Sequence, residues 1–352
     1  MLDLTADPVT LTRQLVDIES VSRGEQQIAD EIEAALRALP HLEVTRRGHT
    51  VVARTHLGRA ERVVIAGHID TVPLNDNLPS RLEDGILHGL GSCDMKSGDA
   101  VLLHLAATLS EPNRDLTFVL YEAEEIEDEF NGLRKLSESD PHLMEADFAI
   151  LMEPSGAIVE AGCQGTLRVD VRTTGERAHA ARSWKGVNAI HGAHEVLARL
   201  NAYDARRPVI DGLEYHEGLN AVFISGGVAG NVLPDECIVS VNHRFAPDRS
   251  VEEAEAFVRE FFGGFEVTVR DSAPAAMPGL GLPAAKEFLD AVGGEVRPKF
   301  GWTDVARFSG LGVPAVNFGP GDPMLAHKQE EHVPVEHIER CERQLRAWLG
   351  GA

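Results

Sequence analysis

The stretch "VVIAGHIDTVP", residues 63–73, joins an apolar run to a histidine, an aspartate and a proline. Residues 63–66 are all apolar, which predicts a buried strand. Because side chains alternate along a strand, His68 and Asp70 point the same way. A histidine beside a carboxylate at a strand end can act as ligand and orienter, or as base and orienter. A surface turn closed by Pro73 is the alternative interpretation.

The composition limits the classes of protein to consider. The chain has 352 residues, 43% of them apolar and 25% charged, which is typical of a globular protein with two domains or one elaborated domain. Its formal net charge of −23 argues against a nucleic-acid partner. We find no apolar run near the ~20 residues of a membrane span and no signal peptide in "MLDLTADPVTLTRQLVD", so we expect a cytoplasmic protein with no membrane partner.

The four cysteines are widely spaced and form no C-x-x-C pair. This spacing argues against a structural zinc ribbon and predicts free thiols. The residues are Cys93, Cys163, Cys237 and Cys341.

Strand-like and helix-like segments alternate in the first part of the chain. This alternation predicts an α/β fold with a mostly parallel sheet flanked by helices. The expected helices lie within 8–39 (two of them) and at 97–109, and the expected strands at 43–55, 62–67, 115–123 and 147–153.

The pattern changes near Gly165, where strands begin to alternate apolar and polar residues. Such strands are typical of an antiparallel sheet with one face in water. Their order with the intervening helices is β-α-β-β-α-β, which predicts an inserted α+β domain of ferredoxin-like type. We therefore assign residues 1–165 plus 281–352 to one domain and residues 166–280 to a second domain inserted into it.

Polar residues follow several of the predicted strands. In open α/β sheets ligands bind beyond the carboxyl ends of the strands, so these side chains are expected to converge. Each has an ordinary structural explanation by itself, but together they favour a metal site. They are His68, Asp70, Asp94, Glu124, Glu125, Glu153 and His327.

The donor types suit two cations. A carboxylate can bridge two metals ~3.5–4 Å apart, and Asp94 fits that role. Imidazole with carboxylate suits Zn²⁺, with Mn²⁺ or Co²⁺ as alternatives. Because neighbours in an extended segment face opposite ways, one of Glu124 and Glu125 can bind metal while the other acts as a base. Asp70 would hold His68 from behind. The remaining acidic residues of this stretch we interpret as a solvated face: Glu122, Glu127, Asp128 and Glu129.

Five motifs, "GHIDTVP", "GSCDMKSG", "EAEE", "MEPS" and "AHK", resemble the signature of the di-zinc amidohydrolases. That family includes aminoacylases, glutamate carboxypeptidase-type enzymes, acetylornithine deacetylases and succinyl-diaminopimelate desuccinylases. The resemblance covers essentially the whole chain and implies a zinc-exopeptidase-like catalytic domain with a lid domain that forms a homodimer. It also implies the following roles: His68 and Glu153 on one zinc, Glu125 and His327 on the other, Asp94 bridging, Glu124 as base and proton shuttle, and Asp70 orienting His68.

The resemblance extends to the inserted domain. "GERAHAARSWKGVNAI" resembles the family segment whose histidine, here His179, reaches a neighbouring subunit's active site and stabilises the oxyanion. "GNVLPDE" and "VNHRF" resemble the segments that supply Asn231 and Arg244. A guanidinium grips a carboxylate through two hydrogen bonds, so Arg244 would clamp a substrate carboxylate, with a salt bridge inside the lid as the alternative.

Within the family, "GWTDVARFSGLGVPAVNFGPGDPMLAHK" most resembles the succinyl-diaminopimelate desuccinylases, with Thr303 at the position of a substrate contact. This implies hydrolysis of N-succinyl-L,L-2,6-diaminopimelate, a small anionic N-acyl amino acid. Three residues depart from the family pattern, Trp302, Asp304 and Gln164, so the resemblance does not assign the acyl pocket. Acetylornithine deacetylase, aminoacylase and dipeptidase activities are the alternatives. A non-catalytic dimeric binding protein is another, against which Glu124 and the full ligand set argue.

Overall fold

The computed structural model describes residues 2–350, and these form two compact units. Unit 1 contains the described residues up to Ala161, Gly279–Arg297, and those from Arg307 onward. Unit 2 contains Gly162–Pro278 and Pro298–Ala306. The second segment of unit 2 carries Thr303, which we had expected in the catalytic part of the chain.

A mixed sheet of eight strands forms the centre of unit 1, in the order β1-β2-β6-β3-β7-β18-β8-β17. Its four middle strands, β6, β3, β7 and β18, are parallel, as predicted. Antiparallel pairs flank them, β2 beside β6 and β8 beside β18. The strands are β1 Glu43–Arg47, β2 Thr50–Arg54, β3 Arg62–His68, β6 Asp115–Tyr121, β7 Phe148–Leu151, β8 Val159–Ala161, β17 Val296–Pro298 and β18 Ala315–Asn317.

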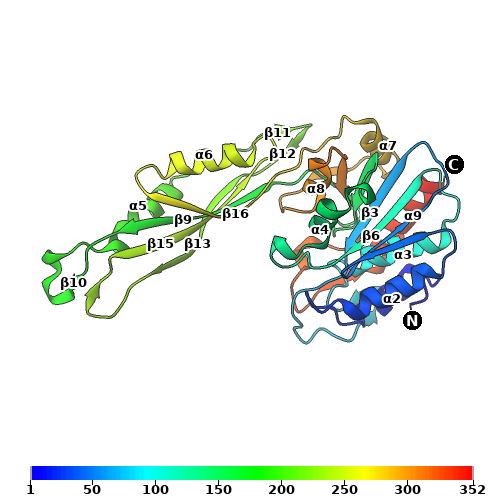
Figure 1. The fold of residues 1–352 in the computed structure, drawn as a ribbon, viewed down its shortest axis with the longest axis horizontal. Coiled ribbons are helices and arrows are strands. Elements are labelled where there is room, and N and C mark those ends of the chain that lie inside the picture. The colour runs from blue at the N-terminus through cyan, green and yellow to red at the C-terminus, as the bar shows by residue number, and fades with distance from the viewer. Residues whose placement is uncertain (1, 351–352) are drawn as a thin grey trace. The chain divides into compact units, whose positions relative to one another are not determined.

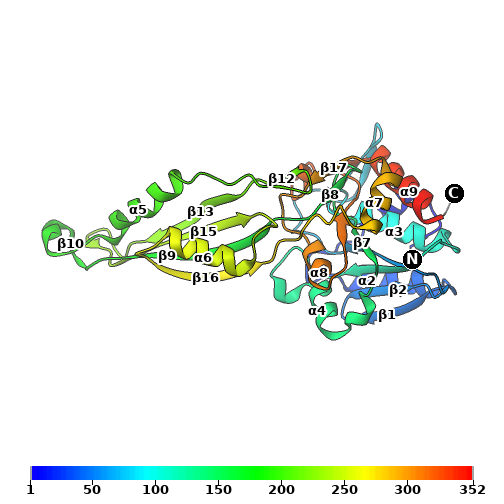
Figure 2. The ribbon, with the colours of Figure 1, turned by 90° about the horizontal axis from the view of Figure 1, so that it is seen from above.

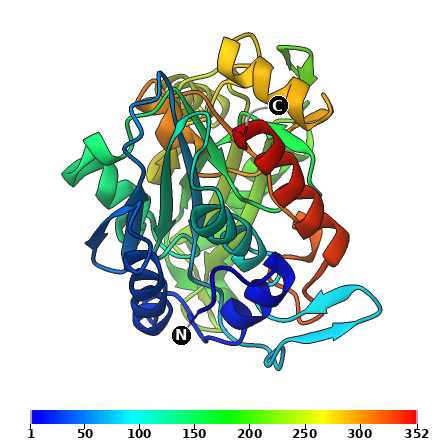
Figure 3. The same cartoon turned by 90° about the vertical axis from the view of Figure 1, so that its right-hand side faces the viewer.

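Helices cover both faces of this sheet, and Figure 3 shows α9 (red) and α4 (green) on opposite sides of the central strands. Except for Arg62 at the start of β3, the four middle strands are buried along their whole length, which explains their apolar runs. The helices are α1 Pro8–Val16, α2 Gln26–Arg37, α3 Lys96–Thr108, α4 Gly132–Ser139, α7 Pro283–Val292, α8 Val305–Gly310 and α9 Val335–Gly350, with short 3₁₀ turns at Asp128–Phe130, Pro141–Leu143 and Pro323–Leu325.

A second, three-stranded sheet joins two distant segments of unit 1. Its order is β19-β5-β4, formed by Arg81–Glu83 (β4), Ile86–His88 (β5) and His332–Pro334 (β19). The antiparallel pairing of β19 with β5 places the segment after His327 beside the segment before Asp94.

Unit 2 is a four-stranded antiparallel sheet in the order β13-β15-β9-β16. Its chain order is β-α-β-β-α-β, as predicted. Helices α5 and α6 pack on one face over a common apolar core (Figure 1, Figure 2). The elements are β9 Gly165–Thr174, β10 Ala178–His179, a 3₁₀ segment Ala180–Lys185, α5 Ala189–Asn201, β11 Val209–Ile210, β12 Leu213–Glu214, β13 Gly218–Gly226, β14 Val232–Leu233, β15 Glu236–Phe245, α6 Val251–Phe261 and β16 Glu266–Ala273.

Two further findings concern the whole described chain. Among residues 2–350, no helix is both long and apolar enough to cross a membrane. All four cysteines are buried free thiols, which confirms that prediction.

Candidate metal centre

Strand β3 ends at His68, and glycines allow the loop before α3 to come beside it. A Cβ atom added to Gly67 would lie 2.1 Å from Asp99 Oδ1, and one added to Gly98 would lie 2.4 Å from the carbonyl oxygen of Met152. Both distances are far below a van der Waals contact, so only glycine lets α3 approach the ends of β3 and β7 this closely. The loop that precedes α3 is thereby brought to the carboxyl edge of the sheet.

The predicted ligand residues come together at this edge. Three groups of side chains each present ligand atoms that all lie within 4.8 Å of one another. The first and third groups share only Asp94. The groups are His68, Asp94 and Glu153; His68, Glu124 and Glu125; and Asp94, Glu125 and His327.

The Asp94 carboxylate lies between two imidazoles, with one oxygen toward each. Asp94 Oδ1 is 3.1 Å from His68 Nε2, and Oδ2 is 3.5 Å from His327 Nε2. His327 Nε2 also lies 3.0 Å from the carboxylate of Glu125. The arrangement gives two neighbouring donor sets that meet at one carboxylate.

The electrostatics of this cluster favour positive charge. Burial lowers the pKa of His68, but the carboxylates of Asp70 and Asp94 outweigh it and hold the pKa well above its ordinary value. Hydrogen bonds to Asp94 and Glu125 raise the pKa of His327 to about 10. Burial acts to raise the pKa of Asp94, but its bonds to the two imidazoles leave it lowered. Divalent cations would neutralise the same carboxylates in place of the imidazole protons, so this donor set fits metal binding.

Asp70 supports both the histidine and the glutamate pair. Its carboxylate accepts hydrogen bonds from the backbone N–H groups of Glu124 (3.0 Å) and Glu125 (3.2 Å), and from Ser22 Oγ (2.7 Å). His68 Nδ1 lies 3.1 Å from the Asp70 carbonyl oxygen and 3.5 Å from its carboxylate. Because these contacts engage Nδ1, the Nε2 atom of His68 faces Asp94.

Two supporting carboxylates were not anticipated from the sequence. Ala123 has a left-handed backbone (φ +56°), and its N–H donates to Glu25 Oε1 at 3.1 Å. Glu331 accepts from backbone N–H groups in the loop that carries Asp94. Neither glutamate belongs to a local motif, so the sequence carries no signal that distinguishes them from surface glutamates.

Our interpretation of the acidic stretch was partly wrong. Glu122 is only 8% exposed, because its carboxylate accepts from the His49 N–H and from Lys135 Nζ. Asp128 is exposed, but it pairs with Arg134 and Arg307. The acidic stretch therefore contains one buried glutamate, Glu122, whose burial cannot be inferred from the density of charged residues.

The remaining predicted residues lie in unit 2. His179 on β10 pairs with Val232 on β14, and the Ala180 N–H donates to the Asn231 carbonyl oxygen at 2.8 Å, which brings His179 and Asn231 together. Arg244 lies on β15.

Thr303 is 4% exposed, and its carbonyl oxygen accepts a hydrogen bond from Cys163 Sγ at 3.7 Å. Its hydroxyl is buried and has no hydrogen-bond partner within residues 2–350.

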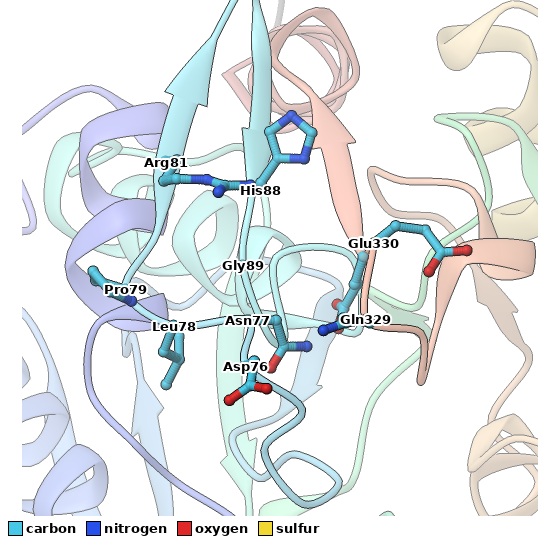
Figure 4. Close-up of a pocket in the computed structure, with 10 residues that line it drawn as sticks. Asp76, Asn77, Leu78, Pro79, Arg81, His88, Gly89, Gln329 and Glu330 are labelled. Atoms are coloured by element: carbon cyan, nitrogen blue, oxygen red, sulfur yellow. The ribbon is translucent and has the colours of Figure 1, made fainter.

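A cavity of about 540 Å³ lies in unit 1 between the β4–β5 hairpin and the segment 329–331 (Figure 4). Arg81 and His88 line it together with Asp76 and Glu330, so its charges are mixed. None of the metal-donor residues lines this cavity. The cavity therefore does not contain the candidate metal centre, although Glu331, which holds the loop of Asp94, is among its lining residues.

Comparison with known proteins identifies the class. The model of peptidase family M20/M25/M40 matches residues 64–349, so the chain belongs to this family. A Mycobacterium tuberculosis protein with the provisional name succinyl-diaminopimelate desuccinylase DapE is 56% identical over 100% of both chains. The succinyl-diaminopimelate desuccinylase of Corynebacterium glutamicum is 52% identical, covering 99% of this chain and 97% of that protein. A tripeptidase from Staphylococcus aureus has the same fold, with a TM-score of 0.79, 21% identity, and coverage of 99% of this chain and 98% of that one.

Proposed function

We propose that this chain is a metal-dependent amidohydrolase that cleaves N-succinyl-L,L-2,6-diaminopimelate into succinate and L,L-2,6-diaminopimelate. The observation that supports this proposal most is the full-length identity of 52–56% to proteins named succinyl-diaminopimelate desuccinylase. The meeting of two donor groups at Asp94 supports hydrolytic chemistry at this place.

The proposed cofactors are two Zn²⁺ ions, with Co²⁺ or Mn²⁺ as alternatives. His68 and Glu153 would hold one ion, Glu125 and His327 the other, and Asp94 both. The donor set of imidazole and carboxylate supports this choice of metals. When bound, such ions polarise a carbonyl group and lower the pKa of water.

Glu124 is the proposed general base and acid. Its backbone N–H is held by Asp70, and its carboxylate belongs to a donor group with His68 and Glu125. In this role the Glu124 carboxylate takes a proton from the attacking water and returns it to the nitrogen of the leaving amine, which balances the protons of amide hydrolysis.

His179 is suited to donate a hydrogen bond. The Ala181 N–H donates to its Nδ1 at 3.0 Å, so the neutral ring carries its proton on Nε2. The side chain is exposed, which leaves Nε2–H available to the oxyanion that forms from the substrate amide. The resemblance that assigns this role also places the oxyanion in the partner subunit.

Arg244, Asn231 and Thr303 are the proposed substrate contacts. Within residues 2–350 the Arg244 guanidinium makes no hydrogen bond or ion pair, although the side chain is partly buried on the open face of the sheet. An uncommitted guanidinium suits a substrate carboxylate, because the two form paired hydrogen bonds. This supports an anionic N-acyl amino acid as the substrate class.

A homodimer formed through unit 2 is part of the proposal. Strand β13 is at the edge of its sheet, and an edge strand offers unpaired backbone groups to a second chain. Large apolar side chains are exposed on β13 and on the neighbouring helix α5, which supports burial against a second copy. They are Val222, Phe223 and Ile224 on β13, and Ile190 and Leu197 on α5.

A substrate panel tests the activity. The purified protein, loaded with zinc, is assayed with N-succinyl-L,L-diaminopimelate, N-acetylornithine, other N-acetyl amino acids and dipeptides at equal concentration. The proposal predicts the highest kcat/KM for the succinyl substrate. A preference for N-acetylornithine or a dipeptide would contradict the substrate assignment, and no hydrolysis of any of them would contradict the enzyme assignment.

A further inference from the structure

Glu331 holds the loop that carries Asp94 through three backbone N–H groups. Glu331 Oε2 accepts from the Gly91 N–H at 3.0 Å, and Oε1 accepts from the Cys93 and Asp94 N–H groups at 2.9 and 3.0 Å. The residue is only 2% exposed, so no bulk water competes for these bonds. Hydrogen bonds from several backbone N–H groups to one buried carboxylate fix a loop more firmly than neutral bonds do.

The same segment ties this loop to the one that carries His327. The Gly89 N–H donates to the Glu331 carbonyl oxygen at 3.2 Å, and the ladder between β19 and β5 continues this pairing. Cys93 Sγ donates to the Asp322 carbonyl oxygen at 3.2 Å. Asp94 and His327 therefore project from one cross-linked piece of backbone.

From these contacts we infer that Glu331 is a positioning residue, which sets the place of the Asp94 carboxylate relative to His327 and so sets the affinity of the metal centre. Glu331 belongs to none of the donor groups, and it acts only through the backbone of the Asp94 loop. The inference rests on the metal binding in the proposed function, but it does not depend on the substrate.

Glutamine and aspartate substitutions probe different parts of this arrangement. In Glu331→Gln the amide group keeps the size of the side chain, but one oxygen becomes an NH₂ donor that faces a backbone N–H. In Glu331→Asp the charge stays, but the side chain is one methylene shorter and cannot reach all three N–H groups. Both variants should loosen the Asp94 loop.

Glu330 provides a matched control. It is the adjacent glutamate, it is exposed, and its carboxylate points away from Gly89 (Figure 4). Glu330→Gln removes the same charge one residue away while leaving the Asp94 loop untouched.

The test measures Zn²⁺ affinity of the metal-stripped, full-length protein by competition with a coloured chelator. We expect Glu331→Gln to bind at least one zinc equivalent about 10- to 100-fold more weakly than the parent, the usual effect of losing a partner that orients a ligand. Glu331→Asp should weaken binding in the same direction, and Glu330→Gln should match the parent. Equal zinc affinity in Glu331→Gln and Glu330→Gln would overturn the inference.

Hydrogen exchange of the metal-free parent decides the case if the Glu331 variants fail to fold. The backbone N–H groups of residues 91, 93 and 94 should exchange slowly even without metal, because Glu331 already holds them. Exchange as fast as that of the backbone N–H groups of Leu74 and Asp76, which lie in an exposed segment, would overturn the inference.

The positioning role of Glu331 and the proposed activity can be refuted independently. If the parent does not hydrolyse the succinyl substrate while Glu331→Gln still weakens zinc binding, the proposed activity is wrong and the positioning role stands.

Discussion

Replacing Asp70 with asparagine should loosen both His68 and the Glu124–Glu125 pair. Asp70 is fully buried, and its carboxylate accepts the N–H groups of both glutamates. The asparagine keeps one oxygen, so one N–H loses its charged acceptor and faces an NH₂ group. The bond that remains weakens by about 1 kcal/mol when the charge is lost, and a buried N–H left without an acceptor costs about 2 kcal/mol. We therefore expect unit 1 to lose about 3 kcal/mol of unfolding free energy.

The free energy of unfolding is measured by urea unfolding of the metal-free protein. Hydrogen exchange of β3 and β6 is the readout, so that unit 1 is measured apart from unit 2. Zinc affinity should fall by about 10- to 100-fold in the same variant, because His68 loses the group that orients its ring. Asp76→Asn is the control, since Asp76 is exposed and lies outside every donor group. If Asp70→Asn and Asp76→Asn show the same stability and the same zinc affinity, the reasoning about Asp70 is wrong.

Three other predictions concern the proposed base, the proposed dimer and a buried histidine of unit 2. Glu124→Gln should lower kcat by several orders of magnitude while elemental analysis finds unchanged zinc, because the variant loses the proton carrier and keeps the assigned ligands. Glu129→Gln, at an exposed position, should keep full activity, and an active Glu124→Gln enzyme would refute the assigned base. Phe223→Glu should convert a dimer to a monomer in light scattering, because a charge enters the exposed edge of β13, whereas Phe300→Glu, exposed elsewhere, should not; a dimeric Phe223→Glu protein would place the interface elsewhere. Burial lowers the pKa of His243 to about 4 from an ordinary 6.5, so the unfolded chain binds the proton more readily and up to about 3 kcal/mol of stability is lost as pH falls from 6.5 to 4. His243→Phe should therefore make the urea midpoint of unit 2 nearly independent of pH over this range, and an unchanged pH dependence would show that other groups cause it.

The convergence of the donor residues was predictable because it depends on a rule of chain topology. His68 and Glu153 follow parallel strands that are neighbours in the sheet, so their side chains had to emerge at the same edge. The ferredoxin-like order of unit 2 was predictable for a similar reason, since alternating polarity shows which strands have one face in water.

The parts that escaped prediction depend on contacts between distant residues. Glu331 binds the N–H of Gly91 across 240 residues, and Glu25 binds the N–H of Ala123 across 98. Both are single glutamates without a local pattern, so nothing in the sequence separates them from surface acids. The burial of Glu122 was missed for the same reason, because its partners His49 and Lys135 come from other elements.

The central claim is that two cations share the Asp94 carboxylate, and anomalous X-ray diffraction at the zinc edge tests it most directly. The account predicts two zinc peaks about 3.5–4 Å apart, with Asp94 between them, His68 on one and His327 on the other. A single peak, or two peaks of which neither touches Asp94, would contradict it.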